Sequence, residues 1–110
     1  MASNFTRKLS RNVGTSATSI GAYTVAAATQ VTAIGLSVAN IAANGIKVSA
    51  EIFDGVNSTR LVKDAPIPVG GTLVIIGGDQ KVVLVTGDQI RVTSDTATSA
   101  DVVLSVLEIT

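Results

Sequence analysis

The run of residues with the clearest chemical potential is APIPVGGTLVIIGGDQKVVLVTGDQIRV, residues 65–92. Glycine beside threonine and aspartate is the composition of loops that bind phosphate through backbone N–H groups. A P-loop, however, also needs a Lys followed by Ser or Thr, and a helix that begins at the glycines. Here the glycines at 70–71 lead into TLVII, which has the composition of a strand, and the GxGxxG spacing of a dinucleotide-binding loop is missing. We therefore expect turns rather than a phosphate site.

The same glycines predict how neighbouring strands are joined. GGDQ at residues 77–80 and TGD at residues 86–88 each separate two apolar runs, as a short hairpin loop does. Two further turn dipeptides, NG at 44–45 and DG at 54–55, flank the segment IKVSAEIF and suit tight hairpin turns.

The acidic residues are the side chains that could bind a metal or perform acid–base chemistry. Four aspartates lie in or beside expected turns, namely Asp79, Asp88, Asp95 and Asp101. Calcium needs six to eight converging oxygen ligands, and the D-x-[DN]-x-[DN]-G pattern is not present, so we expect these aspartates to stabilise turns. Two carboxylate pairs are conceivable, Glu51 with Glu108 and Asp54 with Asp64, but nothing in the sequence brings either pair together. We expect no metal site and no cofactor.

The chain contains no histidine and no cysteine. This excludes Ser-His-Asp sites, His-ligated zinc, a cysteine nucleophile and disulfides. Serine–lysine or carboxylate pairs remain chemically available, but no such constellation is recognisable. We therefore expect that the protein is not an enzyme.

Charge is unevenly distributed, although the formal net charge is zero. Arg7, Lys8, Arg11 and Lys47 are the only charged residues among the first fifty, and the first acid is Glu51. The long uncharged run from residue 12 to residue 46 is repeatedly interrupted by threonine and serine, so it predicts neither a membrane span nor a cleaved signal.

Residues 1–14 show little periodicity and carry three of these cations, which predicts a basic N-terminal arm. We expect Phe5, Arg7, Lys8 and Arg11 to bind a partner. The partner is expected to be an acidic protein neighbour, such as another copy, ahead of packaged DNA, with a solvated tail as the alternative. Three cations would support only weak, salt-sensitive phosphate binding.

The rest of the chain, residues 15–110, has the pattern of short strands. In IKVSAEIF an apolar face alternates with a polar one, the apolar face being Ile46, Val48, Ala50 and Ile52. In TAIGLSVAN the expected core face is Ile34, Leu36 and Val38, opposite a face of small residues. The C-terminal run DVVLSVLEI is apolar on both faces and suits a central strand. About eight strands at regular spacing predict an antiparallel β-sandwich, jelly-roll-like, in one domain.

The run DAPIPVGGTLVIIGGDQKVVLVTGDQIRVTS, followed by SADVVLSVLEI, resembles small β-sandwich structural proteins of tailed bacteriophage particles. In such proteins a Pro-Ile-Pro-x-Gly turn leads into an aliphatic strand, followed by a glycine hairpin, a Gly-Asp turn and a terminal valine-rich strand. The likeness covers about residues 30–110. It implies a virion component, on the capsid surface or at the head–tail neck or tail, and it implies no catalytic residues.

The sequence thus leads to one expectation and one alternative. The expectation is a non-enzymatic structural subunit of a tailed-phage virion, located in the particle. Its partners would be other copies of itself and capsid, neck or tail proteins, with nucleic acid unlikely and no membrane. The alternative is a receptor- or glycan-binding β-sandwich module, which would need clustered aromatic or polar residues in its loops.

Overall fold

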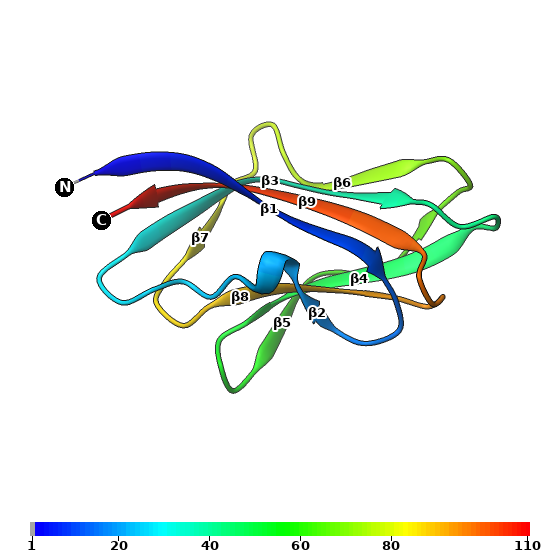
Figure 1. Cartoon of the computed structure of the whole chain (residues 1–110), viewed down its shortest axis with the longest axis horizontal. Coiled ribbons are helices and arrows are strands. Elements are labelled where there is room, and N and C mark those ends of the chain that lie inside the picture. The colour runs from blue at the N-terminus through cyan, green and yellow to red at the C-terminus, as the bar shows by residue number, and fades with distance from the viewer. Residues whose placement is uncertain (1) are drawn as a thin grey trace.

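The computed structural model describes residues 2–110 and consists almost entirely of β-strands (Figure 1). The elements, in chain order, are β1 (Ser3–Val13), β2 (Thr18–Ser19), the 3-10 turn η1 (Ile20–Ala22), β3 (Gln30–Asn40), β4 (Ile46–Phe53), β5 (Ser58–Ile67), β6 (Thr72–Ile76), β7 (Val82–Leu84), β8 (Gln89–Ser94) and β9 (Ala100–Ile109). All strand pairs are antiparallel. The predicted all-β fold is therefore confirmed.

The strands form two packed sheets with the order of a jelly roll. The larger sheet has the order β1-β9-β3-β6, with β7 also paired to β3, and the smaller sheet has the order β2-β8-β4-β5. Both β6 and β7 pair with β3, so they act as two halves of one interrupted edge strand. Counted that way, the molecule has eight strands in two Greek keys, which confirms the predicted jelly-roll-like sandwich.

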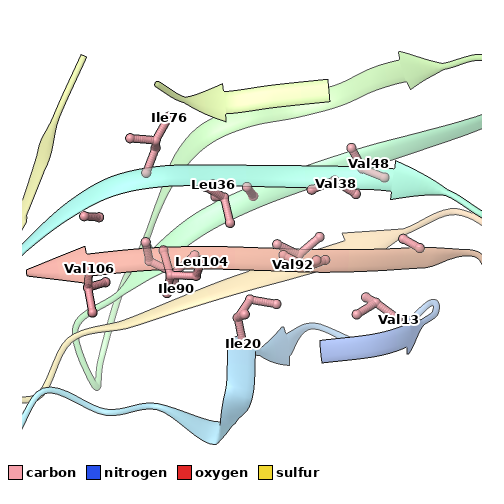
Figure 2. Close-up of a cluster of buried hydrophobic side chains, with 14 of the residues drawn as sticks. Val13, Ile20, Leu36, Val38, Val48, Ile76, Ile90, Val92, Leu104 and Val106 are labelled. Atoms are coloured by element: carbon pink, nitrogen blue, oxygen red, sulfur yellow. The ribbon is translucent and has the colours of Figure 1, made fainter. Parts of the chain in front are cut away.

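The core between the sheets is aliphatic, as a chain with two phenylalanines, one tyrosine and no tryptophan requires. Figure 2 shows how side chains from both sheets meet there, with Leu36 and Leu104 opposite Ile90 and Val92. All four are at most 1% exposed. Such β-branched and leucine side chains fill a pleated interface well, and their removal from water stabilises the fold by about 25 cal/mol per Å².

Strand β9 is a central strand of the larger sheet, as its sequence predicts. It lies between β1 and β3 over most of its length. Val102, Leu104 and Val106 point into the core, each at most 1% exposed. Because side chains alternate along a strand, Val103 and Leu107 face outward.

In β3 the predicted core face is partly wrong. A β-bulge between Ala33 and Gly35 leaves Ile34 without a partner on β9. The extra residue reverses the alternation, so Ala33 is fully buried while Ile34 is only half-buried. Leu36 and Val38 are in the core, as predicted.

In β4 the predicted core face is correct for the three fully buried positions Ile46, Val48 and Ala50. Its other face, expected to meet solvent, is largely covered instead. Ser49 and Glu51 are 8% and 6% exposed because the neighbouring strands β5 and β8 supply polar side chains above them.

The glycines of residues 65–92 do lie in turns. Gly70, Gly78 and Gly87 have φ of +74°, +60° and +92°, a backbone conformation that favours glycine. The expected hairpins, however, are wrong at two of these turns. Residues 77–81 connect two strands that both pair with β3, and residues 85–88 carry the chain from one sheet to the other.

The two turn dipeptides around β4 also differ from each other. The dipeptide at 54–55 closes a true β4–β5 hairpin, whereas the one at 44–45 lies in a crossover between the sheets. In the hairpin, the Asp54 carboxylate accepts hydrogen bonds from the N–H groups of Asn57 at 2.6 Å and Val56 at 2.9 Å. These bonds, the one from Asn57 first, lower the pKa of Asp54.

Candidate functional site

The segment predicted to be a basic arm lies in the larger sheet as its edge strand. Residues 3–13 form β1, which pairs with β9 without interruption from Ser3 to Ser10. In Figure 1 this blue strand runs along the orange strand β9, so residues 1–14 do not form an arm apart from the sandwich over the part described. The jelly-roll order uses this segment as its first strand.

Strand alternation and register place a set of side chains on the outer face of the larger sheet. They lie opposite to the core residues of β9 and occupy three rows that cross the sheet. The rows are Leu9, Val103, Ser37 and Val74; Arg7, Ser105 and Gly35; and Phe5, Leu107, Thr32 and Val83. We call these residues the outer face.

The outer face is apolar and exposed. Phe5, Val83 and Val74 are 77%, 68% and 64% exposed, and Leu9 is 50% exposed. Arg7 is the single charged residue in the three rows, and the remaining polar members are the hydroxyls of serine and threonine. Most large exposed hydrophobic residues of the described chain thus belong to this one surface.

The corresponding face of the smaller sheet is polar and already satisfied within the chain. Arg60 Nη1 lies 3.4 Å from Glu51 Oε1, and the Ser58 hydroxyl donates to the same carboxylate. The Arg91 guanidinium stacks 3.6 Å from the centroid of the Phe53 ring, a cation–π contact. The two outward sheet faces of the described sandwich are therefore chemically different, and of these two the outer face presents a group of large apolar side chains to solvent.

The inner side of β1 has its own polar cluster. Lys8 Nζ lies 4.6 Å from the Tyr23 ring centroid, and the Tyr23 hydroxyl donates to Glu108 Oε2 at 2.5 Å. Burial raises the pKa of Tyr23, and the hydrogen bond and negative charge of Glu108 raise it further. The Ser10 hydroxyl accepts from the N–H of Gly21. These contacts hold the η1 segment against β1 and β9.

The four residues predicted to bind a partner are therefore divided. Phe5 and Arg7 are neighbours on the outer face, whereas Lys8 points to the other side of β1 and contacts Tyr23. Arg11 is exposed and follows the regularly paired segment, because the register with β9 shifts between Ser10 and Val13.

The valines and leucines of the outer face were not predicted from the sequence. Val74, Val83 and Val103 lie in strands with apolar residues on both faces, and Leu9 lies in a segment that was not expected to form a strand. The alternation of Phe5 with Leu9 was a usable signal, but it is meaningful only if residues 3–13 are assigned to a strand.

Three of the four aspartates that could have bound calcium are hydrogen-bonded to backbone groups instead. Asp88 accepts from the Val85 N–H at 2.9 Å, Asp95 from the Lys47 N–H at 3.1 Å, and Asp101 from the Asn12 N–H at 3.1 Å. Within residues 2–110, no three carboxylates come together as potential metal ligands.

Two open hollows are present at the ends of the sandwich. One, of about 450 Å³, lies between residues 28–30, residues 85–86 and the last two residues of the chain. The other, of about 390 Å³, lies between residues 45–47, residues 66–68 and Asp95. Neither contains a converging set of ionisable side chains.

The chain matches no protein-family model and no curated protein. Over residues 2–110, the structure contains no helix that is long and apolar enough to span a membrane.

Proposed function

We propose that the protein is a structural subunit of a tailed-phage virion, which attaches to neighbouring virion proteins through the outer face. The observation that carries this proposal is the contrast between the two faces of the sandwich. The smaller sheet covers its polar groups with its own side chains, whereas the outer face leaves Phe5, Leu9, Val74 and Val83 in water.

The physical argument is one of unburied apolar surface. A monomeric protein rarely keeps a large contiguous apolar patch, and such patches mark interaction surfaces. Each side chain covered by a partner contributes about 25 cal/mol per Å² of apolar area removed from water. The three rows form a nearly uncharged surface on one sheet. A partner that packs on it therefore removes only one charged side chain, Arg7, from water.

The virion assignment itself rests on the resemblance of residues 30–110 to small sandwich proteins of phage particles. An assembly role agrees with the surface described above, since capsid, neck and tail proteins act by adhesion. The rigid aliphatic core keeps the rows in register, and attachment requires no chemical step.

Particle composition tests the assignment directly. Tailed particles are produced from the genome that encodes the chain, purified on a density gradient and quantified by mass spectrometry. We expect the chain at a constant copy number per particle that survives high salt, because apolar contacts are not screened. Absence from intact particles would refute the virion role, and binding of the pure protein to a glycan array would then favour the receptor- or glycan-binding alternative.

A matched pair of substitutions tests the surface. Val83→Lys places a charge on the outer face, and Val56→Lys places the same charge at the β4–β5 turn, where Val56 is 82% exposed. We expect Val83→Lys to reduce incorporation into particles at least tenfold and Val56→Lys to leave it unchanged, with both variants folded by circular dichroism. Equal incorporation of the two variants would exclude the outer face as the attachment surface.

A further inference from the structure

The four lateral edges of the two sheets are not equivalent. An exposed strand edge pairs readily with another strand, and proteins usually interrupt it to prevent this. Strand β2 is only two residues long. Strand β5 has two register shifts against β4, a positive φ of 51° at Asp64, and Pro66, which has no N–H. The β6–β7 edge is broken by residues 77–81, the loop at the top of Figure 1.

Strand β1 is the exception, because its edge is long and regular. Eight consecutive residues, Ser3–Ser10, pair with β9 without a bulge, and the register shifts only between Ser10 and Val13. Three edges of the described sandwich are therefore blunted, and one retains the geometry for strand addition.

The hydrogen-bonding pattern defines which groups this edge offers. Ala2 and Thr110 exchange both backbone hydrogen bonds, at 3.0 and 2.9 Å. In an antiparallel ladder such pairs alternate with pairs that exchange none. The N–H and C=O groups of even-numbered residues in β1 therefore point toward β9, and those of Phe5, Arg7 and Leu9 point away from it.

We infer that β1 pairs with β1 of a second copy, antiparallel, about a two-fold axis at Thr6. Only odd-numbered residues of β1 offer outward backbone groups, so odd-numbered residues of one copy must pair with odd-numbered residues of the other. The two-fold axis must therefore pass through a residue and not between two residues. The regular segment Ser3–Ser10 is centred between Thr6 and Arg7, which leaves these two as the axes with the longest pairing.

Charge decides between the two axes. An axis at Arg7 places two guanidinium groups directly opposite each other, which destabilises a strand pair. An axis at Thr6 places Arg7 opposite Phe5 of the second copy, twice, and Lys8 opposite Asn4. Arginine over phenylalanine is favourable, and the chain already uses this contact across strands of its smaller sheet, where Arg91 lies 3.6 Å from the Phe53 ring centroid.

An axis at Phe5 or at Lys8 is worse for other reasons. Either axis leaves one end of the regular segment Ser3–Ser10 without a partner, so the paired segment is shorter. The axis at Lys8 also places the ammonium groups of the two Lys8 side chains opposite each other. The Thr6 axis is thus the register with the longest pairing and no like charges opposite. It joins the two larger sheets into one, so that the outer faces of both copies become continuous through Phe5 and Arg7. This inference depends on the β1 edge alone and not on the virion role.

Cysteine cross-linking reads the register, because the natural chain has no cysteine. With the axis at Thr6, Thr6 meets its own copy and Asn4 meets Lys8. These even-numbered residues would face each other in pairs that exchange no backbone hydrogen bonds. The Cα atoms of such a pair lie about 4.5 Å apart, which is close enough for a disulfide. We expect Thr6→Cys, equilibrated in a glutathione buffer, to form a disulfide-linked dimer. Asn4→Cys and Lys8→Cys alone should remain at least tenfold less linked, while the double variant Asn4→Cys/Lys8→Cys should link.

A second pair of variants tests the edge itself. Arg7→Pro removes an N–H that points away from β9, so the pairing with β9 is retained, whereas Arg7→Lys keeps both the charge and the N–H. In the Thr6→Cys background, we expect Arg7→Pro to abolish cross-linking and Arg7→Lys to retain it, with both variants folded by circular dichroism.

The outcomes are decisive in either direction. Preferential linkage of Lys8→Cys, or of an Arg7→Cys variant, would overturn the register. Equal linkage at all positions, or no effect of Arg7→Pro, would overturn pairing through this edge. Salt supplies an independent check, since screening of the six cations of two β1 strands should favour the dimer. Weaker linkage at high salt would contradict self-pairing of these two cationic strands.

Discussion

Replacement of Asn40 should destabilise the protein more than any other change of a polar side chain at the end of β3. Asn40 is 5% exposed and joins three segments. Its Nδ2 donates to the carbonyls of Asn44 at 2.9 Å, Ile67 at 3.0 Å and Pro68 at 3.2 Å, and its Oδ1 accepts from the Ala42 N–H at 2.8 Å. The side chain thereby holds the crossover from β3 to β4 against the turn that follows β5.

The magnitude follows from these bonds. Nδ2 has two hydrogens, so its three acceptors share two bonds, and Oδ1 supplies a third. At about 1 kcal/mol net for each bond, Asn40→Ala should lower the free energy of unfolding by about 3 kcal/mol. For a domain of this size the loss corresponds to about 10–15 °C in Tm. Asn40→Asp should cost at least about 1 kcal/mol more, because a carboxylate would face three carbonyl oxygens without a donor.

Urea unfolding followed by circular dichroism measures both variants, with Asn44→Ala as the control. Asn44 is exposed and contributes only its backbone carbonyl, so its truncation should change stability by less than about 0.5 kcal/mol. An Asn40→Asp variant as stable as Asn40→Ala would refute the reasoning, since donation by Nδ2 would then contribute nothing.

Three further outcomes are expected. The single tyrosine should ionise above its ordinary pKa of 10.0, seen as tyrosinate absorbance, and Glu108→Gln should lower that midpoint. Because the folded pKa of Tyr23 is raised, the stability linked to it is present below pH 10 and lost as pH rises through the folded value, and Tyr23→Phe should remove this loss. The turn N–H groups lower the pKa of Asp54, so its contribution is present above the ordinary aspartate pKa of 3.8 and lost as pH falls through the folded value. Acid unfolding of Asp54→Asn should lack that component, and an unchanged acid profile would argue against it. Leu104→Ala should cost about 3–4 kcal/mol in urea unfolding, because its cavity lies in the core, whereas Leu107→Ala on the outer face should cost less than about 1 kcal/mol. Similar costs for the two leucines would contradict the assignment of faces in β9.

The sequence predicted the local features of this fold well. The alternation in β4 identified core residues because a strand that packs on one side repeats every two residues. Turn residues were found for a similar reason, since positive φ at positions such as Gly70 and Gly87 is a local demand on the backbone. The absence of histidine and cysteine limited the available chemistry without any structure.

The pairing of distant strands was not visible in the sequence. The turns at residues 77–81 and 85–88 looked like hairpins, because a turn dipeptide does not encode whether the next strand returns to its neighbour or crosses to another sheet. The bulge at Ile34 was missed for the same reason, since it exists only relative to the register of β9.

The candidate site shows the same division. Phe5, Arg7, Lys8 and Arg11 were recognised by type, as an aromatic and three cations near the N-terminus. Only the pairing of β1 with β9 separated Lys8 from Phe5 and Arg7 and placed these two beside valines from other strands. Composition and periodicity are properties of neighbouring residues, so the sequence by itself determined most of the strands, the turns and the aliphatic core, but not β1. The outer face and the open edge of β1 arise from contacts between residues far apart in the chain, and the tertiary structure alone decided them.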